Sequence, residues 1–222
     1  GDILTTKNNN GEQSYNEDSI KVLLGLDPVK KRPGMYTRKE SPTHIVQEVL
    51  DNAADEALAG YAKNIDLTVF KNGSIEVKDD GRGIPIGVPQ GQKLPAVQLV
   101  FTQLHAGGKF EGQAYKFSGG LHGVGVSVTN ALCTRLEVEV KRDGGVHQIV
   151  FANGGNIESP LKQVGTCLKR ETGTKVTCWP DGKYFYSPVV SMSEITHLVR
   201  SKAVLAPGVN MRLLAEVDPQ SV

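Results

Sequence analysis

The chain has 222 residues, of which 39% are hydrophobic and 22% charged, and its 25 Lys and Arg nearly balance its 24 Asp and Glu. This composition is ordinary for a soluble globular protein, and a net charge of +1, with both signs mixed along the chain, indicates no strongly basic nucleic-acid-binding surface. The three cysteines lack metal-binding spacing, which favours reduced thiols in a cytoplasmic setting, and without a signal peptide or a long apolar run we expect no membrane association.

The N-terminal region is polar before it becomes helical. Residues 1–14 are rich in Asn, so we expect a disordered tail, followed by one domain over residues 15–222. Residues 19–26 are expected to form a short helix that Asp27 and Pro28 stop, since proline cannot continue a helix. A basic turn over residues 30–36 then leads toward the next helix.

Residues 44–60 predict an amphipathic helix, with Ser41 and Pro42 at its start and Gly60 as its C-terminal cap. The apolar face consists of Val46, Val49, Leu50, Ala53 and Ala57. The opposite, polar face consists of His44, Glu48, Asn52 and Asp55. Glu56 borders the apolar face, where a carboxylate should find a cation. Such a polar face fits either a solvated helix surface or a site.

The remaining elements alternate between strands and helices. Strands at 64–70 and 74–78 predict a hairpin around the Asn72-Gly73 turn, and helices are expected at 95–104 and 126–132. After residue 134, the expected strands form an antiparallel meander over 135–141, 147–152, 161–164 and 174–179. A helix at 193–205 and a strand at 210–216 complete the chain.

Residues 119–125 form a glycine-rich segment directly before the helix expected at 126–132. Free backbone N–H groups and the helix dipole make such a segment an anion site, and Lys109 and Lys116 add positive charge nearby in the sequence. The spacing matches neither a P-loop nor a Rossmann fingerprint. The segment therefore favours phosphate binding by another design over a flexible surface loop.

A second candidate site segment follows the strand expected at 74–78. Asp79 would lie at the end of a buried strand, and Gly81 and Gly83 let the backbone approach a flat ligand. A carboxylate in this position could accept a hydrogen bond from the exocyclic amine of adenine. An ordinary Asp-Gly turn is the alternative.

In chain order, Glu48-x-x-x-Asn52, Asp79-x-Gly81-x-Gly83 and the glycine segment resemble the Bergerat (GHKL) ATP-binding fold. Residues 32–36, 104–110 and 172–174 resemble the B subunits of bacterial type II topoisomerases, and residues 164–167, 178–181 and 202–208 are more similar to topoisomerase IV than to DNA gyrase. The resemblance runs from about residue 15 to the end. It implies an α+β fold, a two-layer sandwich of a mixed, mainly antiparallel sheet of about eight strands with helices on one face.

The resemblance also implies a role for each matched residue. Glu48 would be the general base that activates the water attacking the γ-phosphate, with His44 holding it, and Asn52 would bind Mg²⁺. Asp79 would read adenine with help from Thr174 through a water, while Arg82 would lie over the base and pair with Glu56. The expected walls of the adenine pocket are Val77, Ile84, Pro85, Val100 and Val176. The expected lid residues, which wrap the ribose and phosphates, are Lys109, Tyr115, Gly120, Leu121, His122, Gly123, Val124, Gly125 and Val126.

The resemblance further implies cofactors and partners. ATP and Mg²⁺ would be the cofactors, and adenine-site inhibitors would compete for the site. A second copy would receive Tyr15 in its site, and the full subunit would work on duplex DNA with a DNA-cleaving A-type subunit. An isolated fragment without the transducer domain, which supplies a lysine to the γ-phosphate, is expected to be a monomer that hydrolyses ATP very slowly.

Two points bear on the choice of relative. Gln148 is expected at the mouth of the pocket, where the B subunits of gyrase typically have an arginine, and this weakens the gyrase assignment and should weaken coumarin binding. DNA gyrase B is the close alternative, while an Hsp90-like chaperone, a mismatch-repair ATPase or a histidine kinase shares only the fold. The lid sequence and the segment around Lys109 argue against those three.

Overall fold

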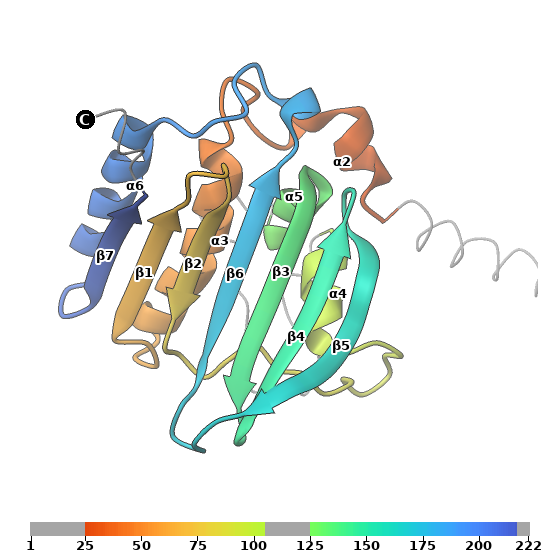
Figure 1. The fold of residues 1–222 in the computed structure, drawn as a ribbon, viewed down its shortest axis with the longest axis vertical. Coiled ribbons are helices and arrows are strands. Elements are labelled where there is room, and N and C mark those ends of the chain that lie inside the picture. Colours follow the sequence, from red (N-terminus) through yellow and green to blue (C-terminus); the bar gives the residue numbers. More distant parts are fainter. Residues whose placement is uncertain (1–24, 105–124, 217–222) are drawn as a thin grey trace, which may run out of the picture.

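A seven-stranded sheet forms one layer of the structure, and the longer helices pack against one of its faces (Figure 1). The computed structural model describes residues 25–104 and 125–216. The strand order across the sheet is β5-β4-β3-β6-β2-β1-β7. The strands are β1 (Asn64–Val69), β2 (Ile75–Asp79), β3 (Cys133–Arg142), β4 (Gly145–Ala152), β5 (Asn156–Thr166), β6 (Gly173–Pro180) and β7 (Asn210–Ala215).

The α+β fold class is confirmed, with seven strands in the described sheet in place of the eight or so expected. Among these strands β7 pairs with β1 in parallel, and all other neighbours pair antiparallel. The meander is correct for β3, β4 and β5 only. β6 returns across the sheet and pairs with β3 and β2, so it lies between the meander and the first hairpin.

The second layer consists of short and medium helices. They are α2 (Asp27–Lys31), η1 (Pro33–Met35), α3 (Thr43–Leu58), α4 (Ala96–Thr102), α5 (Val126–Ala131), η2 (Gly182–Tyr184) and α6 (Met192–Leu205). Helix α3 contacts α5, α6 and strands β1 and β2, which makes it the centre of the layer. Within residues 25–104 and 125–216, no helix combines the length and the apolar character needed to cross a bilayer.

Most of the helix expected at 19–26 lies outside the described residues, but the expectation that Asp27 and Pro28 stop a helix was wrong. Asp27 and Pro28 begin helix α2, and Val29 within it is fully buried. Proline is tolerated in the first turn because its missing N–H would have no partner there, and Asp27 favours the positive end of the helix dipole. The dipeptide therefore acts as a start signal in this chain.

Helix α3 ends as the sequence predicts but begins differently. Gly60 has a φ of +88°, and the amides of Gly60 and Tyr61 donate to the carbonyls of Ala57 and Glu56 at 3.0 and 2.9 Å. This is a Schellman motif, in which glycine adopts the left-handed conformation at low cost. At the other end the helix begins at Thr43, and the Ser41 hydroxyl donates to Glu194 on α6 at 2.8 Å rather than capping the helix.

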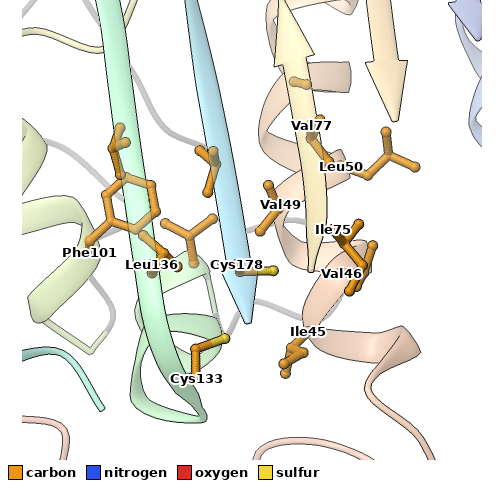
Figure 2. Close-up of a cluster of buried hydrophobic side chains, with 14 of the residues drawn as sticks. Ile45, Val46, Val49, Leu50, Ile75, Val77, Phe101, Cys133, Leu136 and Cys178 are labelled. Carbon is orange, nitrogen blue, oxygen red and sulfur yellow. The ribbon is translucent and has the colours of Figure 1, made fainter. Parts of the chain in front are cut away.

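The hydrophobic core fills the space between α3 and the sheet (Figure 2). The predicted apolar face of α3 is buried in full. Phe101 on α4 and Phe151 on β4 are also fully buried, with ring centroids 6.1 Å apart. Cys133 and Cys178 lie in this core, and all three cysteines are free thiols, as the sequence predicts. The core fixes α3 against the sheet and thereby sets where its polar residues lie.

Candidate active site

The polar face of α3 is buried against the rest of the protein, so the solvated-surface alternative is wrong. Glu48 is 2% exposed and Asn52 7% exposed. His44 is half-buried one turn earlier, and its Nε2 lies 3.3 Å from Glu48 Oε1. Burying a carboxylate is costly unless other groups stabilise it, so this arrangement needs partners.

Two groups from outside α3 support Glu48, one by direct contact and the other through His44. The amide of Gly125 donates to Glu48 Oε2 at 3.1 Å. Gly125 directly precedes α5 and has a φ of +77°, a conformation that favours glycine. On the far side of His44, Thr37 Oγ1 lies 2.8 Å from Nδ1. Sequence reasoning missed Thr37, because it lies in a loop that carries no pattern of its own.

Asp79 ends β2 on the same face of the sheet as the buried Val77 and Ile75. Its carboxylate accepts a hydrogen bond from the amide of Gly81 at 2.8 Å. Burial raises the pKa of the Asp79 carboxyl to about 7, and the neighbouring charge of Glu56 adds to this shift. A buried carboxylate with a shifted pKa at the end of a strand is a typical feature of a ligand-binding site.

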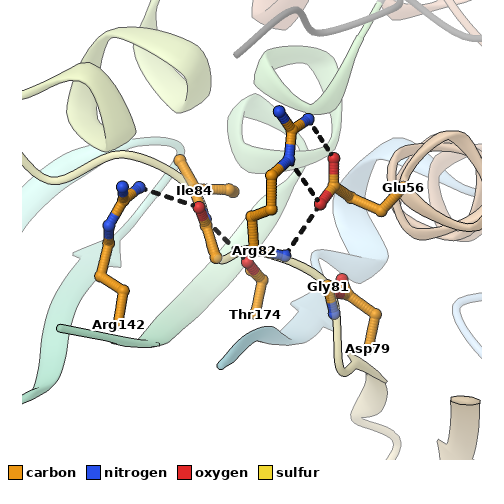
Figure 3. A network of polar contacts seen from close by, with 8 residues as sticks. Glu56, Asp79, Gly81, Arg82, Ile84, Arg142 and Thr174 are labelled. Atoms are coloured by element: carbon orange, nitrogen blue, oxygen red, sulfur yellow. Dashed lines mark hydrogen bonds and ion pairs between the residues drawn. The ribbon is translucent and has the colours of Figure 1, made fainter. Parts of the chain in front are cut away.

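Glu56 finds its cation in Arg82, as the sequence predicts (Figure 3). A β-carbon on Gly81, between these groups, would lie 2.6 Å from Glu56 Oε2 and 2.9 Å from Asp79 Oδ1, so any larger residue there would force these carboxylates to move. The Arg82 guanidinium lies over the ring of Tyr61 at 3.8 Å. Tyr61 follows the helix cap, and nothing in its sequence neighbourhood predicts this contact.

Thr174 and Ile84 join the turn after β2 to strand β6. The Thr174 hydroxyl accepts a hydrogen bond from the Ile84 amide at 3.0 Å, directly across from Asp79 in the strand register. Figure 3 shows Thr174 between Ile84 and Asp79. Thr174 therefore holds the turn in place, and its hydroxyl hydrogen stays available for a further acceptor.

The expectation for Gln148 was wrong. Gln148 pairs with Glu139 on the outer face of the sheet and lines a shallow depression there, while Asp79 lies on the helix-covered face. Arg142, at the end of β3, instead donates from Nη1 to the carbonyl of Gly83 at 3.1 Å. This chain thus has an arginine beside the Asp79 turn, and the expected weakening of coumarin binding loses its basis.

The expected adenine-pocket walls lie around the Asp79 turn. Val77 and Val176 face each other across β2 and β6, and both are buried. Ile84 is fully buried and Pro85 half-buried, and the carbonyl of Pro85 accepts from the amide of Val97 on α4. The remaining expected wall residue, Val100 on α4, and the expected lid residue Val126 at the start of α5 are buried as well.

Several expected site residues lie outside the described residues. These are Tyr15, Lys109, Tyr115, Gly120, Leu121, His122, Gly123 and Val124, together with Lys116. The predicted tail over residues 1–14 also lies outside them. The structure places the other expected polar residues in two groups, with Glu48, His44 and Asn52 on helix α3 and Asp79, Arg82 and Thr174 at the ends of β2 and β6.

The chain is similar to known proteins over most of its length. The B subunit of DNA topoisomerase 4 from Escherichia coli is 53% identical over 206 residues, which are 93% of this chain and 32% of that protein. The B subunit of DNA gyrase from Streptomyces coelicolor is 45% identical over 218 residues, which are 97% of this chain and 31% of that protein. The chain thus spans about a third of the length of these curated relatives.

A solved structure and a family model extend the comparison. The topoisomerase IV ATP-binding domain of Francisella tularensis, in complex with a small-molecule inhibitor, matches with a TM-score of 0.77 and 45% identity, over 86% of this chain and 51% of that one. Residues 37–183, well over half of the chain, match the model described as the histidine kinase-, DNA gyrase B- and HSP90-like ATPase. The chain belongs to this family of ATPases.

Proposed function

We propose that this chain is the ATP-hydrolysing domain of a bacterial type II topoisomerase, from a B subunit of the topoisomerase IV type. The observation that carries the proposal is Glu48, a carboxylate only 2% exposed that contacts His44 and the amide of Gly125. Identity is higher to the topoisomerase 4 protein of E. coli than to the gyrase protein of S. coelicolor, at 53% against 45%. DNA gyrase B remains the alternative.

Glu48 acts as the general base in this proposal. The water that attacks the γ-phosphate must lose a proton, and a carboxylate in hydrogen-bond reach can accept it. Gly125 occupies one lone pair of Oε2, and each carboxylate oxygen has two, so a lone pair stays available for the water. His44 limits the rotation of the same carboxylate from the other side. Together they hold the base in one orientation.

Asp79 selects the base of the nucleotide. Its ionised carboxylate would accept a hydrogen bond from the adenine amine, and the buried walls from β2, β6 and α4 would exclude water around the ring. Arg82, fixed by Glu56, supplies a flat cation at the edge of this pocket. The competing inhibitors of the site would use the same contacts.

Asn52 is the proposed protein ligand of Mg²⁺. Residues 25–104 and 125–216 contain no group of three or more His, Cys, Asp or Glu side chains that could hold a metal ion. Mg²⁺ in nucleotide sites usually takes one or two protein oxygens and completes its shell with phosphate oxygens and waters, so a single buried amide one turn from Glu48 fits it. When bound, the ion neutralises charge on the phosphates.

The partners of the whole protein are part of the same proposal. They are a second copy that closes on ATP, a DNA-cleaving A-type subunit, and duplex DNA that is passed through another duplex. The work takes place in the bacterial cytoplasm. Two assays of the full-length subunit with its cleavage partner separate the alternatives. Decatenation of linked DNA circles is expected for topoisomerase IV, and negative supercoiling for gyrase.

The test of the ATPase proposal is Glu48→Gln in the full-length subunit. The amide keeps the shape of the side chain but accepts protons poorly, so turnover should fall by about 100-fold or more with ATP affinity nearly unchanged. Glu139→Gln, the same change on the outer face of the sheet, is the matched control and should keep wild-type turnover. Wild-type hydrolysis by Glu48→Gln would exclude Glu48 as the base.

The isolated 222 residues offer a second comparison. We expect a monomer that binds ATP but hydrolyses it very slowly, because Glu48 alone cannot stabilise the charge that develops on the phosphoryl group. Light scattering and a coupled ATPase assay measure both properties. Robust turnover by a monomer would show that the described site needs no further residue from the rest of the protein.

A further inference from the structure

We propose that Thr37 is a positioning residue for ATP hydrolysis, because its hydroxyl holds the ring of His44 in the tautomer that directs Nε2–H toward Glu48. The inference rests on the proposed function of Glu48 as the base. It adds a residue that the sequence does not single out and that lies outside the nucleotide-contacting segments. The contact that carries it is the 2.8 Å separation between Thr37 Oγ1 and His44 Nδ1.

Thr37 is held rigidly enough for this task. It is 7% exposed and lies between η1 and α3, and its amide donates to the carbonyl of Pro33 at 2.9 Å. The neighbouring Tyr36 amide donates to the same carbonyl, also at 2.9 Å. The turn therefore fixes the backbone of Thr37, and its β-branched side chain has few rotamers to choose from.

The hydrogen positions follow from what each ring nitrogen faces. Nε2 faces the carboxylate of Glu48, and an unprotonated nitrogen would there set its lone pair against a negative charge. A neutral ring held in this orientation must therefore carry its proton on Nε2, which leaves Nδ1 as an acceptor. The Thr37 hydroxyl fills that need, because its other acceptor, the carbonyl of Arg38, is more distant at 3.4 Å.

In this arrangement Thr37 donates to His44, and the Nε2–H of His44 points toward Glu48. His44 Nε2 lies close to Glu48 Oε1, at 3.3 Å, but the two atoms lack the alignment of a hydrogen bond. Catalytic hydrogen bonds often tighten only when the substrate is bound. Thr37 prevents the ring from turning away before that step, so its effect should appear in turnover more than in ATP binding.

The surroundings of Thr37 decide which substitution is informative. Thr37 and His44 both line a groove of about 1170 Å³ between α3 and α6. Water from the groove could replace the hydroxyl if Thr37 were truncated to Ala. Thr37→Val is the more informative variant, because the second methyl group of valine occupies the place of the hydroxyl, keeps water out and offers no hydrogen bond. Thr37→Ser restores the hydroxyl with a smaller side chain.

Steady-state kinetics of the full-length subunit provide the first test. Thr37→Val should lower kcat by about tenfold with KM for ATP within about twofold, as expected for the loss of one well-placed hydrogen bond. Thr37→Ser should recover most of kcat. The matched control is Thr43→Val, which removes a hydroxyl that contacts Glu194 and not His44, and it should keep wild-type kcat. Wild-type kcat in Thr37→Val would overturn the proposal.

The ring of His44 provides a readout that a loss of stability would not move. In the 222-residue chain with ¹⁵N-labelled histidine, the ring nitrogen signals distinguish the two neutral tautomers and the cation, and His44→Gln assigns them among the five histidines. We expect Nε2–H in the wild type and in Thr37→Ser, and a mixture in Thr37→Val. An Nδ1–H ring in the wild type, at a pH where the ring is neutral, would overturn the proposal.

The two proposals can fail separately. If Glu48→Gln hydrolyses ATP at the wild-type rate, the base is misassigned whatever Thr37 does. If Glu48→Gln is inactive while Thr37→Val keeps both wild-type kcat and the Nε2–H ring, only the role of Thr37 is wrong. A lowered kcat in Thr37→Val that Thr37→Ser does not restore would also count against it, since bulk rather than the hydroxyl would then be responsible.

Discussion

Arg82, in the turn after β2, reaches back to Glu56 on α3 with three donors (Figure 3). Its Nη2 lies 2.7 Å from Glu56 Oε1, and its Nε and backbone amide lie 3.3 and 2.9 Å from Oε2. Glu56 is 4% exposed, so the guanidinium neutralises a carboxylate that would otherwise be costly to bury. The pair thereby joins the helix of the proposed catalytic residues to the turn of the proposed adenine reader.

Arg82→Lys should separate the charge of this pair from its geometry. An ammonium cannot form the forked contact, so we expect a loss of about 1–2 kcal/mol in unfolding free energy and about tenfold weaker ATP binding. Thermal unfolding and titration calorimetry measure the two effects. The matched control is Arg212→Lys, which alters a forked pair with Asp66 at 2.8 and 2.7 Å on the exposed edge of the sheet. It should leave ATP affinity unchanged.

Tyr61 should support Arg82 from the opposite side. Its ring lies 3.8 Å from the guanidinium carbon, and such a contact at a partly exposed site is worth about 0.5–1 kcal/mol. Tyr61→Leu should weaken ATP binding by about two- to fivefold. Tyr61→Phe keeps the ring and should bind ATP as the wild type does. Equal affinities for the Leu and Phe variants would show that the stacked ring has no part in holding Arg82.

The sequence predicts those features of the site that depend on local pattern. The helical period of residues 44–60 separates the buried face of α3 from its polar face, and the place of Glu56 between the two indicates a partner. Gly60 is identifiable as a cap because few other residues take its conformation. Each of these inferences uses residues within one element or its ends.

The features that sequence missed depend on pairing between distant segments. Which face of the sheet Gln148 and Arg142 occupy follows from the register of β4 against β3, and a shift of one residue reverses every side chain. Strand β5 runs over 11 residues, far beyond the short run expected, because pairing with β4 defines it and most of its side chains are exposed. The return of β6 between β3 and β2 is likewise a property of the whole sheet.

Lys202 on α6 and Asp51 on α3 form a buried ion pair on the other side of the central helix. Lys202 is 6% exposed and Asp51 3% exposed. Lys202→Met should cost about 3–5 kcal/mol, or roughly 10 °C in the unfolding midpoint, because it removes the charge that compensates a buried carboxylate. Lys175→Met, which breaks a half-exposed pair with Glu139, should cost less than about 1 kcal/mol. Equal losses in the two variants would contradict this account.

Asp79 should make the stability of the ligand-free protein depend on pH. Its pKa of about 7 lies above the ordinary value of 3.8, mainly because of burial. Between these values the folded protein holds a proton that the unfolded chain has lost, so the stabilisation is complete below about pH 4 and is lost as pH rises through 7. Asp79→Asn resembles the protonated form. Denaturant unfolding should show the wild type losing on the order of 4 kcal/mol relative to this variant over that range.

ATP affinity should have the opposite dependence on pH, since adenine binding requires the ionised form of Asp79. Below pH 7 the carboxyl would carry a proton, and the neutral group is a weaker acceptor for the adenine amine than the carboxylate, so tight binding favours release of that proton. We expect the affinity of the wild type to rise with pH and level off above about pH 7.5. Calorimetry at pH 6 in two buffers of different ionisation enthalpy should detect the released proton.

The control is Asp79→Asn, which should bind ATP weakly at every pH, since its amide cannot accept from the amine without turning a donor toward a buried group. Because ATP itself titrates in this range, the informative quantity is the difference between the two proteins. Parallel affinity curves for the wild type and Asp79→Asn would show that Asp79 does not read the adenine.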